Sequence, residues 1–216
     1  MTLPAIADCH LYLCTPDRPD LSTFVAECIE GGVDIVQLRE KHLAARPLIA
    51  RALLVASVCA DYGVPFIFND RPDLALEVGA DGVHVGQDDA PVGLARRILG
   101  PGAIIGLSTH SASDLSGAAG EDVSYLSAGP VEATPTKPGR PGTGLDYLAL
   151  ATRSATVPVF VTGGVTPEKI PELAEAGARH FVVVRYLTES AEPASAARAL
   201  RQSLQRILDG SPQQGA

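Results

Sequence analysis

The chain has 216 residues, of which 46% are hydrophobic and 19% charged, so a single domain with a substantial core can form. A formal net charge of −8 argues against a general nucleic-acid binder, so any anion must be held by local cations. No apolar run approaches the roughly 20 residues that cross a bilayer, and no cation precedes Arg18, so neither a membrane span nor a signal peptide is expected.

Short apolar segments alternate along the chain with segments whose apolar residues recur at helical spacing. Strands are expected at 11–14, 35–39, 66–68, 82–85, 104–107, 125–128, 159–161 and 181–184. Helices are expected at 21–29, 47–62, 74–78, 92–99, 113–119, 147–153, 168–176 and 194–208. The strand segments do not alternate apolar with polar residues, which is typical of parallel strands covered on both faces.

The eight-fold repeat in a chain of this size predicts a closed (β/α)8 barrel, or TIM barrel. We expect it to be one domain over residues 1–209, followed by a disordered polar tail at 210–216. The alternative is an open doubly wound sheet, which would need a glycine-rich phosphate loop after the first strand. The residues that follow Leu13, Cys-Thr-Pro-Asp-Arg-Pro, contain no glycine, which favours the barrel.

Polar residues follow the carboxyl ends of the expected strands, where the active sites of such barrels lie. In strand order from the second to the eighth, they are Gln37, Arg39 and Lys41; Asn69 and Asp70; Gln87, Asp88 and Asp89; Ser108, Thr109 and His110; Thr134, Thr136 and Lys137; Thr162, Gly163 and Gly164; and Val184 with Arg185. Chance would scatter polar residues over both ends of the strands.

Asp70 and Asp89 end neighbouring strands, where two carboxylates would repel each other unless a cation bridges them. Mg²⁺ prefers oxygen ligands and binds phosphates beside one or two carboxylates. Arg39 and Lys41 could then face a substrate with several negative oxygens, such as a diphosphate. The alternative is that both aspartates cap helices and that the two cations form an ordinary charged rim.

A second anion site is predicted from Gly163 and Gly164, because the loops after strands seven and eight form the usual phosphate pocket of these barrels. Glycines let backbone N–H groups approach a phosphate closely. The segment 131–144 is too rich in Pro and Gly for a helix or central strand, and it carries Lys137 and Arg140. It is either a functional loop or a plain surface loop.

Nucleophilic catalysis is not expected. His84 lies among apolar residues and is interpreted as a satisfied core residue rather than a catalyst. Ser108 and His110 are close in sequence, but no carboxylate is placed to orient the histidine. Two anionic ligands and one metal instead imply a transfer reaction in which diphosphate leaves.

The motifs jointly resemble those of the thiamine phosphate synthase family, in the family's order and over nearly the whole chain. The segments that carry the resemblance are 37–41, 69–70, 82–89, 106–110, 129–130, 134–140, 163–164 and 183–185. The resemblance implies a transferase that couples an aminopyrimidine methyl diphosphate with a thiazole phosphate, or its carboxylated form, to give thiamine phosphate and pyrophosphate. In that family the pyrimidine methylene becomes a stabilised cation before the thiazole nitrogen attacks.

The resemblance also implies roles for particular residues. Positions that hold the pyrimidine diphosphate are matched by Gln37, Leu38, Arg39, Glu40, Lys41, Asn69, Ser108 and Lys137, of which Arg39, Lys41, Ser108 and Lys137 are the implied catalytic residues. Positions that hold the thiazole phosphate are matched by Thr134, Pro135, Thr136, Gly164, Val184 and Arg185. Asp70 and Asp89 match the ligands of Mg²⁺, the implied cofactor.

The chain departs from the family pattern near the thiazole side, at Glu132-Ala133 and at Tyr186. Two other functions remain open: the related thiazole tautomerase, which needs neither the diphosphate cations nor the metal ligands, and a non-catalytic phosphate-binding barrel. The expected partners are small phosphorylated molecules, with no nucleic acid or membrane, and a homo-oligomer is compatible with the sequence. Scattered cysteines without a C-x-x-C pair favour a reducing, cytoplasmic location.

Overall fold

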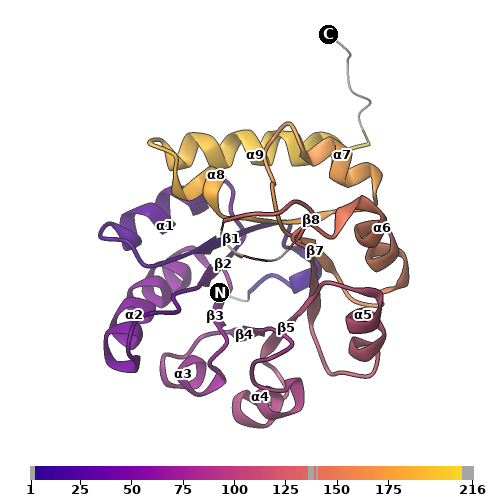
Figure 1. Cartoon of the computed structure of the whole chain (residues 1–216). Helices are drawn as coiled ribbons and strands as arrows, with labels where there is room; N and C mark the ends of the chain where they lie inside the picture. The colour runs from indigo at the N-terminus through magenta and orange to yellow at the C-terminus, as the bar shows by residue number, and fades with distance from the viewer. Residues whose placement is uncertain (1–2, 136–138, 140, 211–216) are drawn as a thin grey trace.

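The computed structural model describes residues 3–135, 139 and 141–210, and its eight parallel strands close into a barrel in chain order (Figure 1). The strands are β1 Leu11–Thr15, β2 Ile35–Leu38, β3 Phe66–Asn69, β4 Gly82–Val85, β5 Ile104–Thr109, β6 Tyr125–Ala128, β7 Val159–Val161 and β8 His180–Val183. β8 pairs back onto β1, with Phe181 opposite Leu11. The predicted (β/α)8 barrel is therefore confirmed.

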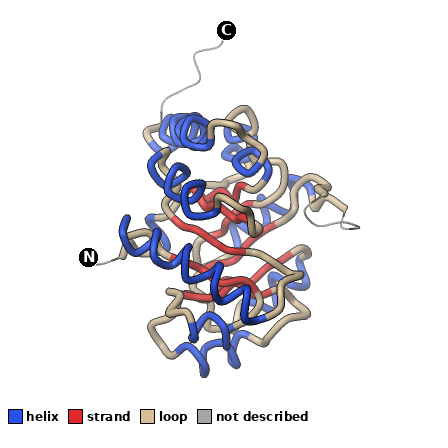
Figure 2. The backbone as a smooth tube through the Cα atoms, turned by 90° about the vertical axis from the view of Figure 1, so that its left-hand side faces the viewer, coloured by secondary structure: helices blue, strands red, loops and turns tan. Residues whose placement is uncertain are grey.

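Helices surround the barrel on the outside, as the blue segments around the red strands show in Figure 2. They are α1 Leu21–Glu30, α2 Ala45–Tyr62, α3 Pro72–Glu77, α4 Val92–Leu99, α5 Ala112–Ala118, α6 Gly144–Ser154, α7 Ile170–Glu175, α8 Arg185–Thr188 and α9 Pro193–Leu208, and a 3-10 turn, η1, spans Ile6–Asp8. Within the part of the chain that is described, no helix combines the length and apolar character that a membrane span requires.

The segment after β8 differs from its expected form. The strand ends at Val183 rather than at residue 184, and the short helix α8 begins directly at Arg185. Pro193 then starts α9 in its first turn, where the missing N–H costs no helical hydrogen bond. α8 was not expected, because four residues are too few to show a helical period. It sets Arg185 at the mouth of the barrel.

Two groups of buried residues form the core. The larger group fills the space between the strands and the helices, and it includes Leu38 and Cys28. The smaller group, inside the barrel, packs the rings of Tyr12, Tyr125 and Phe160 edge to face, with centroids 5.1–6.0 Å apart. These rings fill the middle of the barrel.

Candidate functional site

A cavity of about 470 Å³ opens at the carboxyl ends of the strands. Its walls include at least one residue from, or directly after, each of the eight strands, and Tyr12 and Tyr125 form its floor. Active sites of (β/α)8 barrels occupy this end. The polar residues that follow the strands in the sequence therefore converge on one space.

Most of the predicted site residues line this cavity. They are Gln37, Arg39, Lys41, Asn69, Asp70, Asp89, Ser108, Thr134, Gly164, Val184 and Arg185. Three others do not: Leu38 is buried in the outer core, the Glu40 carboxylate accepts a 2.7 Å hydrogen bond from the backbone N–H of His42, and Pro135 is exposed outside the lining. Thr136 and Lys137 lie outside the described residues, as does the predicted tail beyond Gly210.

Asp70, Asp89 and Lys41 form a charged group on one wall. The Lys41 Nζ lies 2.9 Å from Oδ2 of Asp70. Burial raises the pKa of the Asp70 carboxyl; the hydrogen bond from Lys41 opposes this rise, and the neighbouring Asp89 carboxylate adds to it. The two carboxylates therefore lie close enough to repel each other.

Neither aspartate caps a helix. The N-cap residue of α3 is Arg71 and that of α4 is Pro91, and neither helix receives a side-chain cap hydrogen bond. Oδ2 of Asp89 instead accepts the backbone N–H of Gly86 at 2.9 Å. The alternative prediction that both residues cap helices is wrong, so capping does not explain why the two carboxylates lie beside each other in the cavity.

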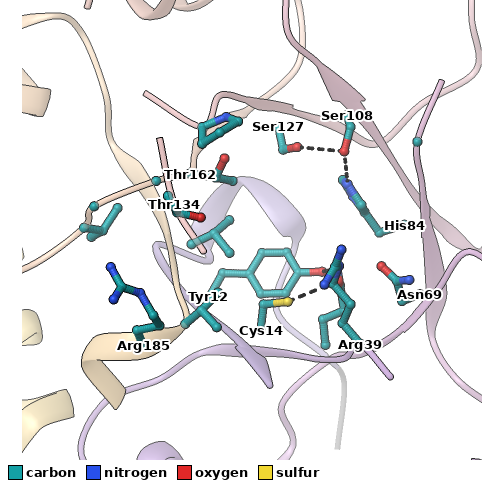
Figure 3. A pocket seen from close by; sticks show the side chains of 18 of the residues that line it. Tyr12, Cys14, Arg39, Asn69, His84, Ser108, Ser127, Thr134, Thr162 and Arg185 are labelled. Atoms are coloured by element: carbon teal, nitrogen blue, oxygen red, sulfur yellow. Dashed lines mark hydrogen bonds between the residues drawn. The ribbon is translucent and has the colours of Figure 1, made fainter. Parts of the chain in front are cut away.

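The floor of the cavity carries polar groups, although the interior of the barrel beneath it is apolar. Gln37 Nε2 donates to the Tyr12 hydroxyl at 2.7 Å, and that hydroxyl lies 2.9 Å from the Tyr125 hydroxyl. Nδ1 of His84 lies 3.0 Å from the Tyr125 hydroxyl, and Nε2 of His84 lies 2.8 Å from Oγ of Ser108. Figure 3 shows His84, Ser108 and Ser127 joined along one edge of the site.

Each of the two histidines near the site makes ring hydrogen bonds to neutral groups. His84 is buried, stacks on the Tyr125 ring at 5.5 Å and is satisfied as the sequence indicated, although it also lines the cavity. His110 Nδ1 hydrogen-bonds the backbone oxygen of Gly129. Neither interaction supplies the carboxylate that orients the histidine of a nucleophilic triad.

The opposite wall carries Gly163, Gly164 and Arg185. Figure 3 shows Arg185 and Arg39 on opposite sides of Tyr12. Gly163 and Gly164 adopt positive φ values of 95° and 76°. A Cβ on Gly164 would lie 2.6 Å from Oε2 of Glu132, so the unusual Glu132 rests against this glycine, and its other oxygen pairs with Lys169.

Sequence patterns did not identify Tyr12, Tyr125 or Lys169 as neighbours of the site, whereas Thr162 was expected there at the end of strand seven. Thr162 Oγ1 is buried and finds no hydrogen-bond partner among the described residues, so it has capacity for a ligand. For Tyr12 and Tyr125, the only signal in the sequence was a tyrosine inside an apolar strand. Burying such a ring requires a hydrogen-bond partner, and only the fold says which one.

Comparison with known proteins gives a consistent result. Residues 11–187 match the family model described as thiamine monophosphate synthase. The thiamine-phosphate synthase of Mycolicibacterium vanbaalenii is 46% identical over 203 residues, which cover 88% of this chain and 91% of that protein. That of Mycobacterium sp. (strain KMS) is 42% identical over 214 residues, covering 93% and 95%.

A solved structure agrees with the sequence matches. The thiamine phosphate pyrophosphorylase of Pyrococcus furiosus superposes with a TM-score of 0.84 at 29% identity, over 92% of this chain and 96% of that one. The relatives are transferases, and their similarity extends over the strands that build the cavity. The chain therefore belongs to the thiamine monophosphate synthase family.

Proposed function

We propose that this chain couples an aminopyrimidine methyl diphosphate with a thiazole phosphate, or its carboxylated form, and releases pyrophosphate and thiamine phosphate. The observation that carries the proposal is the division of one cavity into two walls. Arg39 and Lys41 lie on one wall with two aspartates, and Arg185 lies on the other with Gly163 and Gly164. A diphosphate suits the first wall and a phosphate monoester the second.

Mg²⁺ fits the first wall. The pKa of Asp70 is raised by burial and by the neighbouring Asp89 carboxylate, although Lys41 opposes the rise, and a divalent cation would offset the repulsion between the two carboxylates. No group of three or more His, Cys, Asp or Glu side chains suited to a metal occurs within the described ranges. Asp70 and Asp89 would therefore hold the ion together with diphosphate oxygens and water. When bound, the ion neutralises charge on the diphosphate.

The chain's own residues bind and orient the two substrates. Arg39 and Lys41 would stabilise the charge that grows on the departing pyrophosphate oxygen. The methylene carbon–oxygen bond breaks with its electron pair on that oxygen, and the lone pair of the thiazole nitrogen forms the new carbon–nitrogen bond. No proton needs to be removed by the protein, which agrees with a site where Nδ1 of His84 faces the Tyr125 hydroxyl and Nδ1 of His110 faces a backbone oxygen. The contribution of Lys137 stays a prediction.

The two alternatives use less of the cavity. A thiazole tautomerase needs the phosphate wall but gives no role to Lys41, Asp70 or Asp89. A barrel that only binds phosphate gives no role to the polar floor. The wall that holds these three side chains favours the synthase.

The test is pyrophosphate release from the purified protein. We expect release to require both substrates and Mg²⁺, with one pyrophosphate per thiamine phosphate. Conversion of the thiazole to an isomer without pyrophosphate would establish the tautomerase, and binding without turnover would establish the non-catalytic barrel.

A further inference from the structure

Side chains from five strands form one continuous chain of hydrogen bonds across the floor of the cavity, here called the floor chain. Its members in order are Gln37, Tyr12, Tyr125, His84, Ser108 and Ser127. The successive links measure 2.7, 2.9, 3.0, 2.8 and 3.4 Å. Every member is at most 9% exposed, so each link is made in a low-dielectric setting where its geometry matters most.

Gln37 gives the floor chain a direction, because an amide nitrogen can only donate. Its Nε2 donates to the Tyr12 hydroxyl, while its Oε1 accepts from the Cys14 thiol at 3.4 Å. This orientation of the amide, with Nε2 toward the Tyr12 hydroxyl and Oε1 toward the Cys14 thiol, sets the direction of the floor chain. Since the Tyr12 oxygen accepts from Gln37, its own proton is directed to the Tyr125 hydroxyl, whose proton in turn is directed to Nδ1 of His84.

The direction fixes the state of His84 and then that of Ser108. With Nδ1 as the acceptor, the neutral ring carries its proton on Nε2 and donates to Oγ of Ser108. Ser127 donates more weakly to the same oxygen. Both lone pairs of the Ser108 hydroxyl are then occupied, so its proton is left for the cavity that it lines. Gln87 holds the strand end by donating to the Ser108 backbone oxygen at 2.7 Å.

We infer that Tyr12, Tyr125 and His84 are positioning residues: each accepts a hydrogen bond from the member before it and donates one to the next, starting from Gln37. As a result, the Ser108 hydroxyl can only donate a hydrogen bond to the ligand. Such a hydroxyl selects an acceptor, either a ring nitrogen or a phosphate oxygen, and disfavours an amino group. The choice of the pyrimidine diphosphate as that ligand rests on the proposed function. The direction of the floor chain does not.

If the hydrogen bonds of the floor chain ran in the opposite direction, Ser108 would have a different chemical role. If Ser108 donated to His84, the serine could be activated as a nucleophile by the histidine. A protonated Nε2 cannot accept that proton. The floor chain therefore assigns Ser108 to binding and excludes a serine nucleophile in this state of the ring.

The tautomer of His84 is measured directly by ¹⁵N NMR of the ligand-free full chain. The chain contains five histidines, so a His84→Gln variant identifies the resonances by their loss. We expect a neutral ring protonated on Nε2. A ring protonated on Nδ1, or on both nitrogens at neutral pH, overturns the inference whatever the substrate of the protein is.

A Gln37→Glu variant tests whether Gln37 sets the direction. An ionised carboxylate can only accept, so Tyr12 must donate to it and every following link must reverse. We expect His84 to change to the Nδ1–H tautomer at a pH where the ¹³C shift of the new carboxyl shows that it is ionised. An unchanged tautomer under that condition contradicts the inference. A merely structural role of Gln37 predicts no such change at His84, which is separated from Gln37 by the two tyrosines.

A double-mutant cycle connects the floor chain to the reaction. Ser108→Ala should lower turnover of the pyrimidine diphosphate by about tenfold, and Tyr125→Phe by about threefold, as expected for a lost and a misdirected hydrogen bond. In the Ser108→Ala background, Tyr125→Phe should cost less than about twofold, because the two act through one donor. Tyr147→Phe removes a hydroxyl from a buried tyrosine outside the cavity lining and should leave turnover unchanged.

Additive losses in this cycle would show that Tyr125 does not act through Ser108, and they would overturn its positioning role. If none of the variants changes the turnover of the pyrimidine diphosphate while the tautomer is as expected, the error lies in the proposed substrate rather than in the direction of the floor chain. A Tyr125→Phe protein with unchanged His84 tautomer ratios and unchanged turnover would overturn the positioning role itself. Retained thermal unfolding midpoints in all variants show that the comparison is made on folded protein.

Discussion

Asp70 has a φ of 63°, a conformation that few residues other than glycine adopt. Its backbone N–H donates to the His84 oxygen at 2.8 Å, which keeps the residue beside β4. There the Asp70 carboxylate meets Lys41 and lies close to Asp89. An unusual backbone conformation is thus linked to the placement of two carboxylates, as is common where a site needs a fixed geometry.

Asp89→Asn tests the metal assignment at the residue scale. The amide oxygen of asparagine can still accept the Gly86 N–H, so the loop should stay in place while one negative charge is lost. We expect Mg²⁺-dependent turnover to fall at least about tenfold, with an unchanged thermal unfolding midpoint. Asp88→Asn is the matched control, because Asp88 is exposed and outside the cavity lining. Full activity of Asp89→Asn at low Mg²⁺ would show that the assignment is wrong.

Gly164→Ala tests the second wall. The new methyl group would meet the Glu132 carboxylate at 2.6 Å, and the positive φ adds a strain of about 1–2 kcal/mol. Gly79→Ala imposes similar strain at a φ of 65° with no atom within 4 Å of the methyl group. We expect both variants to lose similar stability, and only Gly164→Ala to bind thiazole phosphate more weakly in calorimetric titration. Equal affinities for the two variants would remove Gly164 from the site.

At the scale of the elements, the strands were predictable because they are short, mostly apolar segments, and all but β5 and β8 are buried at every residue. The polar residues after the strands could then be assigned to the site, because parallel strands bring their carboxyl ends to one end of the barrel. Alternation within a strand explains why the 37–41 motif contributes unevenly: Gln37 faces the cavity, and its neighbour Leu38 faces the helices.

The floor chain could not be predicted in the same way. The hydroxyls of Tyr12 and Tyr125 meet across 113 positions of sequence, and no local pattern indicates which buried hydroxyls face each other. The short helix α8 was missed for a related reason, because its start is set by the end of β8 and its packing rather than by a period. Tertiary contacts supply both features.

Lys41→Ala tests whether the two walls bind different ligands. Lys41 follows β2, whereas Arg185 follows β8, so removal of the lysine should affect only the diphosphate. Loss of one charge-assisted contact costs about 1.5–3 kcal/mol, and turnover should fall at least about tenfold because charge grows on the leaving oxygen. Thiazole phosphate should bind as before. Arg46→Ala, an exposed cation of α2 outside the lining, is the control.

One outcome of the Lys41→Ala experiment would contradict the assignment of separate walls. If this variant weakens both ligands to the same extent in calorimetric titration, the walls are not separate. The assignment of diphosphate to the Asp70 side would then fail together with it.

At the scale of the whole molecule, the folded barrel buries all four cysteines. Burial raises the pKa of Cys9 and of Cys28 from the ordinary 9.0 to about 12. A thiolate is the reactive form of cysteine, so the folded barrel should protect these thiols chemically. Disulfide-forming reagents at pH 8 should modify Cys9 and Cys28 slowly in the folded chain and rapidly after unfolding in guanidinium chloride.

The same pKa values predict how stability depends on pH. The folded pKa lies above the unfolded value, so folding favours the protonated thiol, and its contribution is fully present below pH 9. It is lost as the pH rises from 9 towards 12, at up to about 1.4 kcal/mol per pH unit for each thiol. Cys28→Ala removes one such group from the core. The cost of its smaller side chain is the same at every pH, so the difference in unfolding free energy between wild type and variant should shrink as the pH rises above 9. Denaturant titrations at pH 7, 9 and 10 measure this difference, and a constant value would mean that Cys28 titrates alike in the folded and unfolded chains.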